Sequence, residues 1–167
     1  MNARRRQMLV DGLAAGIAGY LAVVLFVALW NLAAGRSPFF TAALLGEAVF
    51  LGLRDVSAVT LDPGMVLAFN GVHLLAFLLF GFFAAWLMYE TELHPSFWYL
   101  SLALFVAAAV LAYGAIAALT ALVGGLVSPL LVVAASLVGA GAVAAYLTVL
   151  HRPLMRSIGG VGEDVAR

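Results

Sequence analysis

Residues 9–34 read LVDGLAAGIAGYLAVVLFVALWNLAA, an apolar run broken only by Asp11 and Asn31. At about 1.5 Å per residue, a helix of this length exceeds the roughly 30 Å hydrocarbon core of a bilayer. Arg4, Arg5 and Arg6 precede the run. The apolar segment of a cleavable signal peptide is only about 7–15 residues long. We therefore interpret this run as a transmembrane helix that stays in the protein.

Three more apolar runs are long enough to cross a bilayer, at residues 63–89, 95–123 and 127–150. Each has a proline close to its start, Pro63, Pro95 and Pro129, and proline is favoured in the first turn of a helix. The pair Gly124-Gly125 separates the last two runs. The sequence therefore predicts four transmembrane helices.

The composition supports this assignment for the whole chain. Of 167 residues, 66% are hydrophobic and 10% are charged, against about a quarter charged in soluble domains. The fold class expected is all-α, a polytopic integral membrane protein with one membrane domain over residues 1–167. Zero net charge argues against a nucleic-acid partner, and the absence of cysteine excludes disulfides and thiolate metal sites.

A shorter apolar segment lies between the first two predicted spans, at residues 38–53. Ser37-Pro38 is typical of a helix start, with serine as the cap and proline in the first turn. The segment is too short to span a membrane comfortably and too apolar to lie in water. It is expected to be an interfacial or re-entrant helix.

Arginine counts predict the orientation. With four spans, the outward side holds only Arg36 and Arg54. We therefore expect both termini in the cytoplasm and the protein in the inner (plasma) membrane. The cytoplasmic side holds six arginines: Arg4, Arg5, Arg6, Arg152, Arg156 and Arg167.

Small residues gather on one face of the first span and on one face of the fourth, as they do where membrane helices pack closely. These residues are Gly12, Gly16, Gly19, Ala135, Gly139 and Ala142.

His73 lies near the middle of the second span, where an ionisable group is costly. Asn70 is three residues earlier, on the same helical face. One interpretation is a cofactor or proton site, with His73 as a haem ligand or relay and Asn70 orienting it. The other is a structural hydrogen bond from His73 to a neighbouring helix, with Tyr20, Tyr113 or Thr120 as partner.

The 38–53 segment carries large apolar side chains and one acid, Glu47, which shares a helical face with Arg54. Such anchors are typical of a docking surface for another subunit. An alternative is that the segment braces the protein in the outer interface. The predicted docking residues are Phe39, Phe40, Glu47, Phe50, Leu51 and Arg54.

Near the expected cytoplasmic boundary, Glu90, Glu92, His94 and His151 include two acids and two imidazoles. Their spacing matches no defined zinc pattern, so no metal site is predicted.

No residue set in the sequence points to a catalytic mechanism, and we do not expect an enzyme. Few intramembrane charges and many small-residue faces favour a non-catalytic accessory or scaffold subunit of a larger bacterial membrane complex, respiratory or photosynthetic in kind. Two alternatives stay open. One is a small homo-oligomeric transporter or channel lined by Asn70, His73 and Glu47. The other is a haem-binding or other redox protein using His73. The expected partners are the lipid bilayer and other membrane subunits.

Overall fold

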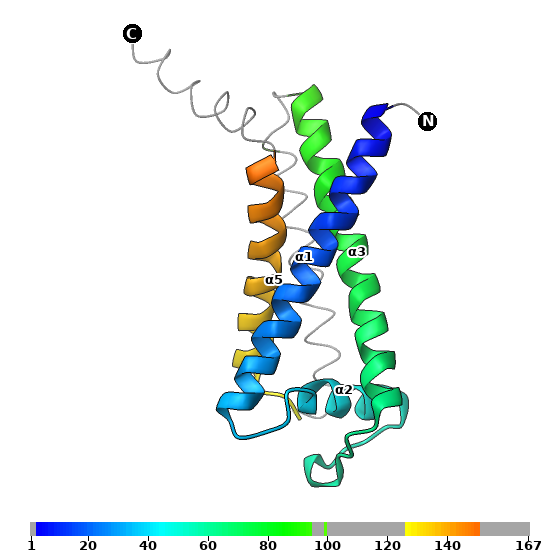
Figure 1. Ribbon diagram of the computed structural model, residues 1–167, viewed down its shortest axis with the longest axis vertical. Helices are drawn as coiled ribbons and strands as arrows, with labels where there is room; N and C mark the ends of the chain where they lie inside the picture. The colour runs from blue at the N-terminus through cyan, green and yellow to red at the C-terminus, as the bar shows by residue number, and fades with distance from the viewer. Residues whose placement is uncertain (1–2, 95–98, 100–125, 151–167) are drawn as a thin grey trace.

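The computed structural model describes residues 3–94, 99 and 126–150, and within these ranges the chain is helical, without strands (Figure 1). Helix α1 covers Ala3–Ala33, α2 covers Phe40–Phe50, α3 covers Pro63–Leu93 and α5 covers Pro129–Leu150. A single 3-10 turn, η1, covers Val56–Ala58. Helices α1, α3 and α5 are each long and apolar enough to cross a membrane. The predicted all-α class therefore holds for the described part of the chain.

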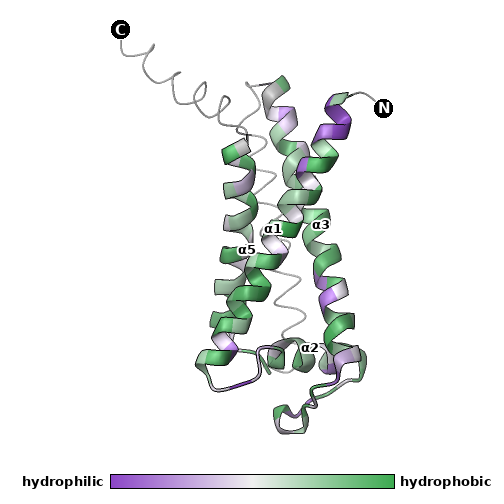
Figure 2. Ribbon diagram, in the orientation of Figure 1, coloured by the Kyte–Doolittle hydropathy of each residue, from purple (hydrophilic) through white to green (hydrophobic). Residues whose placement is uncertain are grey.

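The three long helices form an elongated bundle in which α1 packs along both α3 and α5. Helix α1 begins at the end of the bundle where α3 and α5 finish, and α2 lies across the opposite end (Figure 1). Figure 2 shows apolar residues along the length of the helices and polar ones at the start of α1. Leucines on the sides of the bundle are widely exposed, with Leu67 at 72%.

Helices α1 and α3 cross so closely that glycine is required at the contact. A Cβ atom on Gly16 would lie 2.7 Å from the carbonyl oxygen of Phe77, and one on Gly81 would overlap the carbonyl oxygen of Gly12. On α5, a Cβ on Gly139 would lie 2.6 Å from the ring of Phe77. The small-residue faces predicted for the first and fourth spans are thus confirmed at Gly16 and Gly139.

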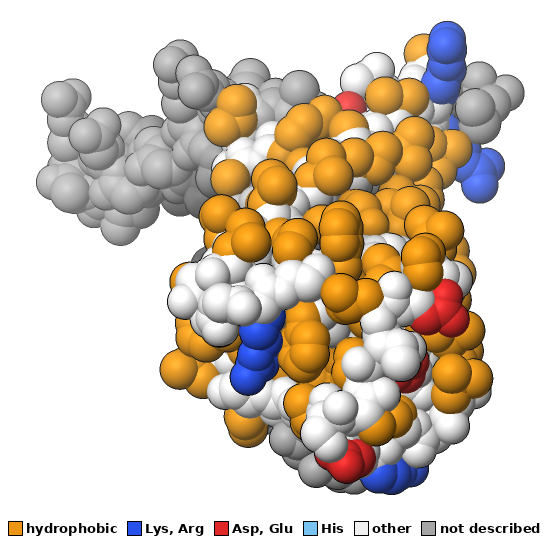
Figure 3. All heavy atoms as spheres, turned by 60° about the horizontal axis from the view of Figure 1, so that its bottom comes forward, with side chains coloured by type: hydrophobic (Ala, Val, Ile, Leu, Met, Phe, Trp, Pro, Cys, Tyr) orange, Lys and Arg blue, Asp and Glu red, His pale blue; other side chains and the backbone are white. Residues whose placement is uncertain are grey.

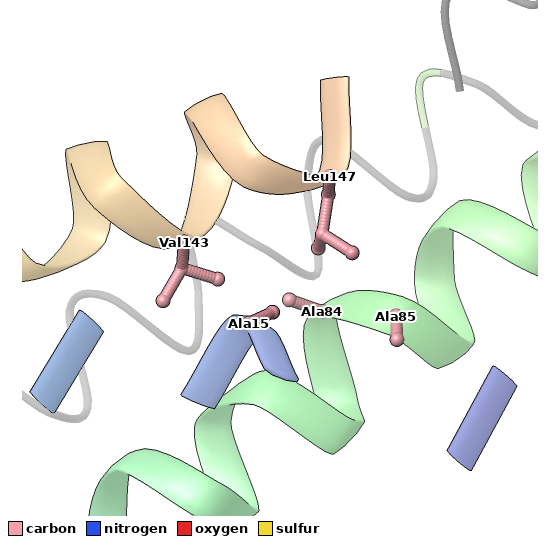
Figure 4. Packing of buried hydrophobic residues seen from close by; sticks show 5 residues of the cluster. All are labelled: Ala15, Ala84, Ala85, Val143 and Leu147. Atoms are coloured by element: carbon pink, nitrogen blue, oxygen red, sulfur yellow. The ribbon is translucent and has the colours of Figure 1, made fainter. Parts of the chain in front are cut away.

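The same crossing holds the larger of two buried apolar clusters (Figure 4). Ala15 of α1, Ala84 of α3, and Val143 and Leu147 of α5 point toward one another there, and Ala85, the next residue of α3, is fully buried beside them. Their short side chains let the three helices approach closely, which is how membrane helices gain packing energy when lipid is as apolar as they are.

Several of the predicted boundaries differ from the observed ones: α1 begins at Ala3, before the predicted residue 9, and α2 ends at Phe50, before residue 53. The start of α3 is as predicted, because the carboxylate of Asp62 accepts the Gly64 N–H at 2.7 Å and caps the helix. Helix α2 begins at Phe40, after Ser37-Pro38, because the Ser37 carbonyl accepts the Phe40 N–H in a separate turn. Helix α3 runs to Leu93, past the predicted end at residue 89. The predicted span at 95–123 lies outside the described residues, apart from residue 99.

Candidate functional site

The polar residues near the middle of the bundle form one interhelical hydrogen bond. The Tyr20 hydroxyl of α1 donates to Oδ1 of Asn70 on α3, at 3.0 Å. The Asn70 amide also donates to the Val66 carbonyl, one turn earlier on its own helix, at 2.8 Å. Asn70 is therefore engaged with Tyr20 and its own backbone, so its amide ties α3 to α1.

His73 lies one turn further along α3, in an aromatic setting. Its ring stacks on Phe69, with centroids 5.5 Å apart, and meets Phe77 edge-on at 5.2 Å. The Tyr20 ring lies 6.3 Å away. No hydrogen bond joins His73 to another residue in the described part of the chain. The predicted partners Tyr113 and Thr120 lie outside the described residues, so both interpretations of His73 stay predictions.

Glu47, one of the six predicted docking residues, is turned into the protein and only 4% exposed. Its Oε1 accepts the Thr60 N–H at 3.1 Å, and the Thr60 hydroxyl donates to the same oxygen. Within the described residues Glu47 forms no ion pair with Arg54. The acid therefore holds the segment after α2 against the helix.

The other predicted docking residues divide into two groups. Phe40 is partly buried and packs into the second apolar cluster, around Leu44, Val127 and Leu131. The rest of the set lies on the surface: Phe39 (59% exposed), Phe50, Leu51 (67% exposed) and Arg54.

A second polar cluster joins α1 to α3 at the end of the bundle away from α2. Asp11 is 2% exposed and accepts from the Tyr89 hydroxyl at 2.7 Å and from the Gln7 amide at 3.0 Å. The Arg4 guanidinium donates to the Tyr89 carbonyl at 2.8 Å and lies over the Tyr89 ring. In the sequence, Asp11 was noted only as an interruption of the first apolar run, and this cluster was missed. Its position next to the small-residue face of Gly12 was a signal that it faces a helix.

A third polar contact closes the turn between α1 and α2. Asn31 accepts from the Thr41 hydroxyl at 2.9 Å and donates to the Pro38 carbonyl at 3.2 Å. The Asn31 carbonyl also accepts the Arg36 N–H at 2.9 Å. The hydrogen bonds of this buried asparagine hold the turn between α1 and α2 in place.

Together these features define a class. Three helices able to cross a membrane, joined by glycine contacts and buried hydrogen bonds, indicate a helical membrane protein. No group of three metal-ligating side chains occurs among the residues that the structure describes. No protein-family model, curated protein or solved structure matches the chain.

Proposed function

We propose that the chain is a non-catalytic accessory or scaffold subunit of a larger membrane complex. One observation carries the proposal: each of the five buried polar side chains in the described ranges has a hydrogen-bond partner within the chain. A catalytic or transport site needs polar groups that turn toward a substrate or a path. Here four such groups connect separate segments of the chain, and Thr91 donates to the Leu87 carbonyl of its own helix. The five groups are Asp11, Asn31, Thr41, Glu47 and Thr91.

The proposal includes a topology of four spans, with residues 95–123 as the third. It is supported by the described helices, because α3 finishes at the end of the bundle opposite to the start of α5 (Figure 1). The arginine distribution supports cytoplasmic termini in an inner membrane. In this topology α2 lies at the outer interface, at the level where α1 ends and α3 begins.

A cofactor role for His73 is the second candidate, and the setting of its imidazole favours it. The ring lies half-buried between Phe69 and Phe77, without a hydrogen bond in the described part of the chain. An imidazole in such a setting is available to a ligand. The channel alternative has less support, because Asn70 and Glu47 are each held by residues of the chain itself.

Gentle detergent extraction of an affinity-tagged chain tests the two candidates together. A scaffold subunit is expected to co-purify with other membrane proteins in fixed ratio, identified by native mass spectrometry, and to show no visible absorption of its own. A chain that purifies alone contradicts the scaffold role. A visible absorption band that is lost in His73→Leu would favour the cofactor role.

Cysteine labelling tests the topology, and the background is clean because the chain has no cysteine. An impermeant maleimide added to intact cells is expected to label Ser57→Cys and to leave Glu92→Cys unlabelled until the membrane is opened. Labelling of Glu92→Cys from outside would reverse the orientation.

A further inference from the structure

The surface at the end of the bundle that carries α2 is apolar. A surface in contact with water would be expected to be polar. Phe39 precedes α2, and Phe50 and Leu51 lie at its other end, all three exposed. Figure 3, which turns this end toward the viewer, shows hydrophobic side chains spread over it among few charged ones. Leu32, near the end of α1, and Leu67, near the start of α3, are exposed as well.

An exposed arginine stands near each end of α2. The Arg36 guanidinium lies over the Phe40 ring, with Cζ 4.9 Å from the centroid, and its backbone N–H is held by Asn31. Arg54 follows Gly52, whose φ of +73° turns the chain at the end of the helix. The 11 residues of α2 measure about 16 Å, and the two arginines stand near its opposite ends, so we assign a separate phosphate to each.

The acids at this end are already engaged. Asp55 accepts from the backbone and hydroxyl of Ser57, at 2.8 and 2.7 Å, and these hydrogen bonds hold the pKa of its carboxyl below its ordinary value. Asp62 caps α3, and Glu47 is buried against Thr60. Neither arginine therefore forms an ion pair with an acid in the described part of the chain.

We propose that the exposed edge of α2 binds phospholipid headgroups of the outer leaflet, with a phosphate on Arg36 and another on Arg54. Phe39, Phe50 and Leu51 enter the upper acyl region beneath those phosphates. The proposal rests on the topology given under the proposed function, which sets α2 at the outer interface.

Lipid is favoured over a protein subunit because two exposed arginines at this end, without an acidic partner among the described residues, match phosphate in charge. Arginine bridging to phosphate above an apolar anchor is also typical of interfacial helices. Asp55 and Asp62 are also exposed at this end, and each carboxylate keeps acceptor sites beyond the hydrogen bonds described above, so the surface has mixed charge. A zwitterionic headgroup, with phosphate for the arginines and ammonium for the acids, fits that mixture.

Spin labels on single cysteines test the apolar part in native membrane particles extracted with an amphipathic polymer, which keeps lipid and neighbouring proteins in place. Labels at Phe39→Cys, Phe50→Cys and Leu51→Cys are expected to collide with oxygen and to be shielded from an aqueous nickel chelate. Ser57→Cys is the water control and Leu75→Cys the mid-membrane control. Shielding of the three labels from both reagents would mean that protein covers the edge, and chelate access equal to that of Ser57→Cys would mean water. Either result overturns the proposal.

Carbon–phosphorus dephasing in solid-state NMR tests the arginines. The full chain, with ¹³C at every arginine Cζ, is placed in vesicles of phosphatidylcholine and phosphatidylethanolamine. The wild-type spectrum minus that of the R36Q/R54Q variant isolates two guanidinium carbons, and lipid ³¹P is expected to dephase them. A difference signal without dephasing refutes the phosphate contact. Dephasing that requires added phosphatidylglycerol refutes the zwitterionic assignment. Both results are independent of whether other subunits co-purify.

Discussion

Gly81 and Gly71 provide a matched pair of substitutions in α3, because only one of them lies at the helix crossing. A Cβ on Gly81 would lie 2.5 Å from the Gly16 nitrogen and 2.7 Å from its Cα, and would overlap the Gly12 carbonyl oxygen. At Gly71 no atom of the described residues lies within 4 Å of the added atom. Both residues lie within α3, so each alanine variant raises the helix propensity by the same amount. The two variants differ in the space around the added Cβ atom.

The size of the effect follows from these distances. Carbon atoms in contact lie about 3.5–4.0 Å apart, so Gly81→Ala must push α1 and α3 apart by about 1 Å. Overpacking of this kind costs about 1–3 kcal/mol, and the separation also loosens the contact of Ala15 with Ala84 and Ala85. Gly71→Ala is expected to lie between no change and about 1 kcal/mol of stabilisation, from helix propensity alone.

The assay is reversible unfolding in mixed micelles, with dodecyl sulfate as denaturant and far-ultraviolet circular dichroism as the signal. The free energy of unfolding is compared for the wild type, Gly81→Ala and Gly71→Ala. Equal values for the two variants would show that the close crossing of α1 and α3 does not exist in the folded protein.

Four substitutions, three of a tyrosine hydroxyl and one of the His73 imidazole, extend the same assay, one of them as a control. Tyr89→Phe removes a hydrogen bond to a buried carboxylate and is expected to lower the free energy of unfolding by about 1–2 kcal/mol. Tyr146→Phe, whose hydroxyl has no hydrogen bond within the described residues, is the control, and an equal loss in both would refute the Tyr89 contact. Tyr20→Phe removes the bond to Asn70 and is expected to cost about 0.6–1.7 kcal/mol. His73→Leu is expected to cost less than Tyr20→Phe, and a larger loss would indicate a hydrogen bond from the imidazole beyond the described ranges.

The predictions from sequence were correct where a few neighbouring residues determine the structure. The spacing of Gly12, Gly16 and Gly19 defines one helical face whatever the partner, and that face is the contact with α3 and α5. Asp62-Pro63 starts α3 because a cap needs only the next two residues. Both features are encoded within a few positions of the chain.

The same reasoning failed where partners are distant in sequence or compete locally. Asp11 meets Tyr89 across 78 positions, and no periodicity reports that pair. The spacing of Glu47 and Arg54 would place them on one face of a continuous helix. However, α2 ends at Phe50, and the returning chain brings Thr60 to the carboxylate instead. Hydrogen bonds from a neighbouring backbone and hydroxyl satisfy a buried acid without the desolvation of an arginine.

The distribution of polar contacts explains why the sequence describes architecture better than activity. Helices in lipid gain little from the hydrophobic effect when they associate, so close packing and hydrogen bonds must supply the energy. Helix α1 meets this need at three levels, through Asp11 at one end, Tyr20 near the middle and Asn31 at the other end. Polar side chains used in this way hold the segments of the chain together. The His73 imidazole and the arginine-flanked edge of α2 are not used in this way within the described residues, so the spectroscopic experiments on those two places bear most directly on the proposals made for this protein.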